Sequence, residues 1–324
     1  MPPPVRRKLL AFTWVILVLA LALAGNALAN NGGIAPPAKS PQAKRIQDVY
    51  WLVLVVTGVI FVLVEGALIM FAVRFRNRGR PREVEGPQIR GHSRLELIWT
   101  VIPVLILAGI ISFVFYKLPG SDTVPAANAA GPKMTVKVEG RQFYWRFTYP
   151  NGAVAVNELR VPVDRPIDLE ITAPANDVAH SWWIPSLGGK RDAIPGKTNH
   201  LGFTAPHLGL YEGQCAEFCG VQHALMLARV LAVPESDFDT WVAAQLNAGA
   251  DLGKQTFDGA CGPCHGLDGK GLIGPPLQGN ATVANKKLLL QLLANGKNAM
   301  PPVGRGWNDN QLNALAAYVK QRFS

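Results

Sequence analysis

Soft metal ligands gather in one short segment of the sequence. Thiol, imidazole and thioether side chains follow one another at Cys215, Cys219, His223 and Met226, and a further imidazole, His180, stands at the end of an expected strand. Ligands of this kind select copper over hard cations. The residue types leave two alternatives open, a disulfide between the thiols and a zinc site. Because Met226 is no zinc ligand and His223 lies beside the thiols, the pattern favours copper.

A second group, Cys261, Cys264 and His265, has the Cys-x-x-Cys-His spacing of covalent haem attachment. Two thiols one helical turn apart can add to both vinyl groups on one porphyrin edge, and His265 can then ligate the iron. A redox dithiol and half a zinc site share the Cys spacing, but the adjoining His favours haem c. Met300, the last Met of the chain, is the expected second axial ligand, since a thioether raises the reduction potential.

Short β-rich runs, separated by Gly, Pro and Asn, surround the copper-type ligands and predict strands. They cover residues 134–138, 143–149, 159–163, 166–172, 198–204 and 226–233. A helix over 236–246, opened by Pro234 and an acidic first turn, is expected to close this region. The sequence therefore predicts a small antiparallel sandwich or barrel over residues 132–247.

Over residues 251–324 the pattern changes to helices joined by loops. Helical periodicity leads into Cys261 and returns over 285–294 and 309–322, which predicts a small all-α module. Residues 119–250 carry 10 basic and 13 acidic residues, a net charge of −3, whereas residues 251–324 carry 8 and 4, a net charge of +4. Opposite signs favour docking of one module on the other.

Two apolar stretches, 51–73 and 97–118, approach the roughly 20 residues that a membrane-spanning helix needs. They predict a two-helix anchor in the lipid bilayer over residues 46–118. Seven arginines between them place the connection in the cytoplasm, so both outer ends face the export side. An export signal over residues 1–29 is expected from basic residues ahead of an apolar run and a small-residue site, with cleavage after Ala29. A permanent transmembrane helix is the alternative for that segment.

The formal net charge of +10 does not indicate binding of nucleic acid. Up to Leu118 there are 14 basic and 5 acidic residues, a surplus of 9, whereas the rest of the chain has 18 and 17. The excess charge therefore lies near the membrane. The outer modules have no basic patch with interleaved aromatic residues, so nucleic acid is not an expected partner.

Residues 47–245 resemble subunit II of cytochrome c oxidase, whose copper loop has the pattern Cys-x-Glu-x-Cys-x3-His-x2-Met. The resemblance implies a cupredoxin-like Greek-key β-barrel with a dinuclear copper centre, CuA. It implies that Cys215 and Cys219 bridge the two coppers. The remaining ligands would be His180 and Met226 for one copper, and His223 and the backbone carbonyl of Glu217 for the other.

The same resemblance implies roles for four side chains around the copper and the membrane. The Glu217 carboxylate would bind Mg²⁺ or Mn²⁺ at the interface with subunit I. Glu96 would stand at the cytoplasmic mouth of a proton path into subunit I, with an ordinary interfacial charge as the alternative. Phe143 and Trp145 belong to the family's aromatic stretch above the copper, which is linked to electron relay. The family commonly has Trp where Phe143 stands, and simple core packing is the alternative for both rings.

Residues 251–324 resemble a class I cytochrome c domain, including a loop at 274–277 whose backbone orients the haem's His. The whole arrangement resembles caa3-type oxidases. It implies that a donor cytochrome c passes electrons to the haem, then to copper, then into subunit I. There oxygen would be reduced to water and protons pumped, with subunit III as a further partner. The copper and haem modules would lie on the periplasmic side of a bacterial inner membrane.

Three other functions fit parts of this pattern. A copper-type nitric oxide reductase would differ only in what its subunit I reduces. A copper-delivery protein has no need of a covalent haem, and a quinol oxidase subunit has no need of intact copper ligands. On the favoured interpretation the oxygen-reducing site lies in subunit I, so the activity of a proton-translocating cytochrome-c oxidase belongs to the complex.

Overall fold

The structure is a computed structural model that describes residues 37–76, 88, 90–123, 131–247 and 250–323. The export signal expected over 1–29 and most of the arginine-rich connection lie outside these residues. The chain forms two compact units. One comprises Arg45–Pro119, and the other comprises the described residues on either side of that range.

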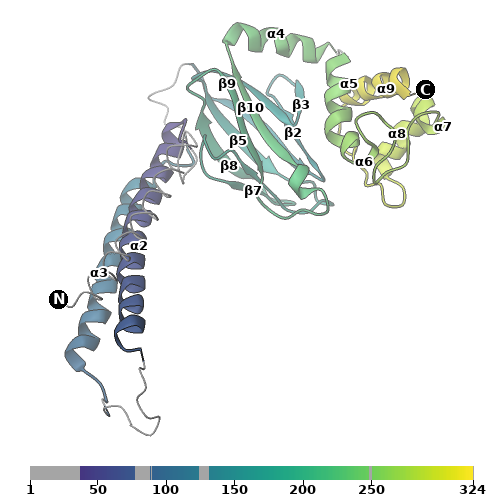
Figure 1. The fold of residues 1–324 in the computed structure, drawn as a ribbon. Coiled ribbons are helices and arrows are strands. Elements are labelled where there is room, and N and C mark those ends of the chain that lie inside the picture. Colours follow the sequence, from purple (N-terminus) through teal and green to yellow (C-terminus); the bar gives the residue numbers. More distant parts are fainter. Residues whose placement is uncertain (1–36, 77–87, 89, 124–130, 248–249, 324) are drawn as a thin grey trace, which may run out of the picture. The chain divides into compact units, whose positions relative to one another are not determined.

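The first unit is a pair of long apolar helices, α2 (Pro41–Arg74) and α3 (Ser93–Lys117), which run alongside each other (Figure 1). Both are long and apolar enough to cross a membrane. An ion pair of 3.1 Å between Lys117 at the end of α3 and Asp48 near the start of α2 joins their outer ends. The helix α2 begins well before the apolar run predicted at 51–73, because its first turns are polar and hydropathy marks only the part that lipid can cover.

The copper-type ligands belong to a sandwich of two five-stranded sheets, ordered β3-β2-β1-β5-β8 and β4-β10-β9-β6-β7 (Figure 1). The strands of the first sheet are β1 (Met134–Arg141), β2 (Tyr144–Thr148), β3 (Val154–Val156), β5 (Pro166–Thr172) and β8 (Asn199–Thr204). Those of the second are β4 (Glu158–Pro162), β6 (His180–Trp183), β7 (Arg191–Ala193), β9 (Gly209–Cys215) and β10 (Leu227–Val233). The predicted sandwich is confirmed and most of its strand pairs are antiparallel, but β1 pairs with β5 and β4 with β10 in parallel. Parallel neighbours arise because the chain crosses to the other sheet before it returns.

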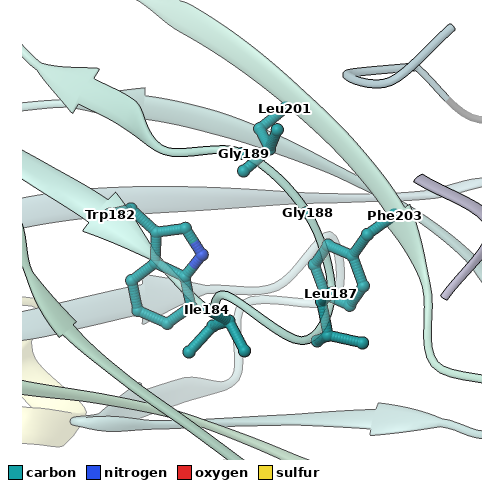
Figure 2. A pocket seen from close by; sticks show the side chains of 7 residues that line it. All are labelled: Trp182, Ile184, Leu187, Gly188, Gly189, Leu201 and Phe203. Carbon is teal, nitrogen blue, oxygen red and sulfur yellow. The ribbon is translucent and has the colours of Figure 1, made fainter. Parts of the chain in front are cut away.

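Large aromatic side chains fill the space between the sheets. Trp145, Phe147 and Trp182 are fully buried, and the first two meet Trp182 edge-on with ring centroids 5.2 and 5.4 Å away. A cavity of about 10 Å³ remains near Trp182, close to the smallest volume that holds one water. Its lining, shown in Figure 2, consists of Trp182, Ile184, Leu187, Gly188, Gly189, Leu201 and Phe203. An apolar space of this size has no room for a ligand larger than one water.

The C-terminal module is helical, as expected. The elements after β10 are α4 (Glu235–Leu246), α5 (Ala250–Thr256), the π-helix η3 (Phe257–Cys261), α6 (Gly262–His265), α7 (Ala281–Ala284), α8 (Lys286–Asn295) and α9 (Asp309–Phe323). The helices predicted over 236–246, 285–294 and 309–322 are confirmed as α4, α8 and α9. Asn285 lies just before α8 rather than in it, because its side chain accepts hydrogen bonds from the backbone of Lys287 and Leu288.

The helical module packs directly on the edge of the sandwich, and the two share a hydrophobic core. Tyr144 of β2 and Val156 of β3 are buried in the cluster formed by the helical residues around Phe257 and Leu293. A methyl group added at Gly259 of η3 would overlap the Val156 side chain, so the η3 backbone packs directly against that side chain. Contact of this kind resembles the inside of one domain more than a weak docking surface.

Buried hydrogen bonds reinforce this shared core. The Tyr144 hydroxyl donates to the backbone carbonyl of Val303 and accepts from Trp307 Nε1, both at 3.0 Å. Arg146 Nε donates to Gln311 Oε1 at 3.0 Å, and both side chains are buried. In each of these hydrogen bonds at least one partner is uncharged. None of the three is an ion pair between the negatively charged and the positively charged module.

Replacing Tyr144 with Phe tests this interface. The change leaves the Trp307 N–H and the Val303 carbonyl unpaired in a buried place, which costs about 1–3 kcal/mol. We expect the helical module to unfold at lower denaturant concentration, followed through the haem Soret band of the full chain.

The matched control is Tyr149→Phe, whose hydroxyl bonds only to the backbone of Arg160 inside the sandwich. It is expected to weaken the sandwich with a smaller effect on the haem transition. If the Soret band of Tyr144→Phe changes at the same denaturant concentration as that of the native protein, the two modules do not share a core.

Candidate metal and haem centres

The copper-type ligands are brought together by a hairpin and one neighbouring strand. The antiparallel strands β9 and β10 pair Gln214 with Leu227, and their connection carries the ligand-rich segment. The Cys215 backbone N–H donates to the Met226 carbonyl at 2.9 Å and closes that loop at its base. Beside it β6 pairs with β9, with Trp182 opposite Cys215, and His180 stands two residues before Trp182 in β6. The predicted ligands are therefore adjacent in space.

The side chains form a tight, mostly buried cluster. A ring nitrogen of His180 and the sulfur atoms of Cys215 and Cys219 lie within 4.8 Å of one another, and all three residues are buried. Cys219 Sγ lies 3.7 Å from His223 Nδ1 and 3.9 Å from Met226 Sδ. Two sulfurs in contact with two imidazoles and a thioether form a donor set for soft metal ions.

One further residue, Asp177, holds the buried imidazole in place. Asp177 Oδ1 lies 3.1 Å from His180 Nε2, while the other ring nitrogen, Nδ1, is buried with no hydrogen-bond partner among the described residues. An unpartnered buried nitrogen is costly unless a metal ion takes its lone pair. Sequence reasoning missed Asp177. The signal was available, since a metal-bound His usually has its second nitrogen on a carboxylate or carbonyl.

The two thiols respond to each other electrostatically. The hydrogen bond from Cys219 lowers the pKa of Cys215 below its ordinary value, and the same contact raises the pKa of Cys219. Two sulfurs this close compete for one proton. A metal ion that replaces the proton would let both become thiolates, so the pair fits a bridging role.

Glu217 lies in the loop between the two thiols. Its backbone carbonyl is 3.2 Å from Cys215 Sγ, so this oxygen borders the sulfur cluster. Its carboxylate is about half exposed and lies 4.0 Å from Lys190 Nζ. The two ends of Glu217 thus face different environments, the cluster and the surface.

The aromatic side chains near the cluster differ in burial. Trp145 is fully buried with its ring centroid 6.0 Å from that of His180, so the core ring also contacts a candidate ligand. Phe143 is partly buried and lies close enough to Gly220 that a methyl group there would touch its ring. Gln142 Nε2 donates to the Cys219 carbonyl at 2.6 Å and braces the same loop. The turn between β1 and β2 therefore supports the loop from one side.

Glu96 lies in the other compact unit, in the first turn of α3. Its Oε1 accepts a hydrogen bond of 3.0 Å from the His92 backbone N–H, which caps the start of the helix. A carboxylate at a helix N-terminus is stabilised by the helix dipole. The observed contact is thus a structural one.

The haem motif is placed for attachment at the end of a short helix. Cys261 ends η3 and is buried, Cys264 lies in α6 and is partly exposed, and burial raises the pKa of Cys261 to about 12. A buried, protonated thiol is a poor redox nucleophile, which argues against a redox dithiol. His265 Nδ1 is hydrogen-bonded to the Pro275 carbonyl at 2.8 Å, which leaves Nε2 for an iron.

The candidate sixth ligand, Met300, lies in the loop between α8 and α9. It is partly buried and packs against the hydrophobic core of the helical module. Its backbone forms a bridge with Lys297, which shapes the loop. The structure therefore places both candidate axial residues in one module whose apolar interior suits a haem.

The chain matches known families over most of its length. Residues 29–117 match the transmembrane domain of cytochrome c oxidase subunit II, and residues 153–233 match the periplasmic domain of the same protein. Residues 248–319 match cytochrome c oxidase, cbb3-type, subunit III. The C-terminal module therefore matches a cytochrome family that takes its name from subunit III of the cbb3-type oxidase.

Three similar proteins show the range of relatives. Cytochrome c oxidase subunit 2 of Alkalihalophilus pseudofirmus is 34% identical over 249 residues, 74% of this chain and 72% of the relative. Quinol oxidase subunit 2 of Bacillus subtilis is 33% identical over 251 residues, 75% and 76% of the two chains. The crystal structure of the periplasmic domain of subunit II of cytochrome oxidase from Bradyrhizobium japonicum is 33% identical, with a TM-score of 0.34, and covers 35% of this chain and 94% of that one. The chain therefore belongs to the cytochrome c oxidase subunit II family and carries a cytochrome c domain at its C-terminal end.

Proposed function

We propose that this chain receives electrons from a donor cytochrome c and passes them through haem c and a dinuclear copper centre into subunit I of a respiratory oxidase. The observation that carries the proposal is the buried cluster of His180, Cys215 and Cys219, with His223 and Met226 at its rim. Membership of the subunit II family supports assembly with subunit I. Subunit III and the bacterial inner membrane belong to the proposal.

The proposed copper centre assigns a role to each candidate ligand. Cys215 and Cys219 would bridge two coppers, His180 and His223 would bind one copper each, and Met226 and the Glu217 carbonyl would be weak ligands. Asp177 orients His180, and the closed hairpin loop holds the sulfurs. A shared pair of thiolates spreads one electron over two metals, and a rigid site keeps bond lengths nearly unchanged on reduction. Electron transfer then needs little reorganisation.

In the helical module, Cys261 and Cys264 would hold the porphyrin, while His265 and Met300 would bind the iron. The Pro275 carbonyl fixes the ring of His265 and makes it a better electron donor to the metal. A bound haem c supplies a one-electron carrier whose potential the Met ligand raises.

Two carboxylates extend the proposal toward the partner subunit. The exposed carboxylate of Glu217 is assigned to a Mg²⁺ or Mn²⁺ ion shared with subunit I, since hard cations prefer oxygen ligands. Glu96 is assigned to the cytoplasmic mouth of a proton path. Phe143 and Trp145 are assigned to electron relay beside the copper loop, where both rings already lie.

A copper-type nitric oxide reductase is the second candidate function, because the chemistry of this chain is the same in both complexes. The reaction belongs to subunit I. Isolating this chain with its partner and measuring reduction of oxygen and of nitric oxide separates the two.

The direct test is to purify the full chain with haem attached and copper supplied, and to measure metal content, optical spectrum and EPR spectrum. Two coppers per chain, one covalent haem, and a hyperfine pattern from an electron shared equally by two copper nuclei are expected. One zinc per chain, or a disulfide between Cys215 and Cys219 without copper, would rule out the copper centre.

Replacing Asp177 with Asn tests the orientation of the copper ligand. The amide can present its NH₂ group to His180 Nε2 and favour the wrong tautomer, so copper affinity is expected to fall by about 10- to 100-fold. Competition with a copper chelator measures the change. The control is Asp168→Asn on β5, whose carboxylate lies 3.1 Å from Lys133 Nζ instead. Equal copper affinity in the two variants would remove Asp177 from the site.

Replacing Met300 with Leu tests the axial ligand of the haem. Loss of the thioether is expected to lower the haem potential by a sizeable part of the roughly 0.8 V that axial ligands control. A spectroelectrochemical titration of the full chain measures this. The control is Met134→Leu, a buried Met of β1 in the sandwich. If both variants keep the native potential, another residue or a water binds the iron.

A further inference from the structure

Gln222 joins the copper loop to the haem attachment loop. Its Nε2 donates to the Pro263 carbonyl at 2.6 Å and lies 3.9 Å from Cys264 Sγ. Pro263 stands between the two cysteines of the haem motif. Gln222 is peptide-bonded to His223, a proposed copper ligand. A single side chain thus links the backbone at one centre to the attachment loop of the other.

The burial of Gln222 is costly. Only 4% of its surface is exposed, and its Oε1 is buried without a hydrogen-bond partner among the described residues. An apolar side chain of the same size would avoid this penalty. A buried amide that is only half satisfied therefore calls for an explanation.

A second contact lies at the Met300 loop. Tyr144 donates to Val303, three residues after Met300, and Arg141 lines a polar cavity of about 40 Å³ with Pro301 and Pro302. The copper module therefore touches both the segment that would attach the haem and the loop that carries the candidate axial Met.

The shared core keeps these contacts in place. Tyr144 and Val156 are buried among helical residues, and Val154 packs with Leu252 and Ala314. This packing reaches Cys261, the first cysteine of the haem motif, through apolar contact. Gln222 adds a hydrogen bond to Pro263, between the two cysteines.

We propose that Gln222 is a positioning residue for electron transfer between haem and copper, holding the Cys264 side of the haem against the His223 side of the copper loop. The inference rests on the proposed function. In the step it serves, the haem iron is oxidised by one electron and the copper pair is reduced by one. The donor cytochrome then restores the haem.

The test compares Gln222→Leu with Gln214→Leu in the full chain carrying haem and copper. Leu keeps the volume but cannot donate, and Gln214 is an exposed residue of β9 one position before Cys215. The haem is reduced by pulse radiolysis, and the relaxation of the electron to copper is followed optically. Loss of one hydrogen bond is expected to slow this transfer about fivefold in Gln222→Leu by depopulating the docked loop. Gln214→Leu should keep the native rate.

Two further measurements separate positioning from a merely structural role. In Gln222→Leu the transfer rate should become dependent on solvent viscosity, since loop motion would then limit it, while the copper EPR and haem spectra stay native. In copper-free protein, hydrogen exchange of peptides covering residues 264–274 should speed up.

The proposal fails if Gln222→Leu transfers electrons at the native, viscosity-independent rate. It also fails if that variant loses copper, because Gln222 would then serve the copper loop alone. If the native chain binds no copper, the proposed function fails first, and hydrogen exchange in the copper-free protein still shows whether Gln222 holds the attachment loop.

Discussion

The proposed copper centre depends on one constraint, the closure of the loop between β9 and β10. A loop that buries two thiols and a thioether also buries backbone polar groups, and each of these needs a hydrogen-bond partner. Cys215 N–H to Met226 carbonyl ties its base, and Gln142 to Cys219 carbonyl ties its middle. The pairing of β6 with β9 then brings His180 to the sulfurs. The strands of the sandwich thus fix the position of this loop.

Rigidity continues into the helical module. Because Tyr144 and Val156 of the sandwich are buried in the helical core, the haem module is an extension of the copper module and not a carrier on a tether. A tethered carrier would exchange between docked and free states, and its transfer rate would depend on the docked fraction. A fixed module avoids that loss.

The burial of two polar side chains outside the ligand set is informative about their role. Gln222 is a buried polar side chain and Asp177 a partly buried one; both lie outside the ligand set and contact residues at the proposed redox centres. Such groups are expensive unless paired. Their cost is consistent with a role in placing the centres, whereas the Glu217 carboxylate is about half exposed.

The sequence alone determined the chemistry and the modules. Ligand types and spacing at Cys215–Met226 and at Cys261–His265, apolar length in the anchor, and periodicity in α4, α8 and α9 are local properties. Other features are not local. The strand β9 carries Gly209 and Gly213 and lacks an apolar alternation, and it is a strand because β6 and β10 pair with it on either side. The parallel pairs and the Gln222 bridge join residues whose meeting depends on packing of whole sheets and helices, so only the tertiary structure decided them. Asp177 lies only three residues before His180, and its role could have been predicted from the sequence.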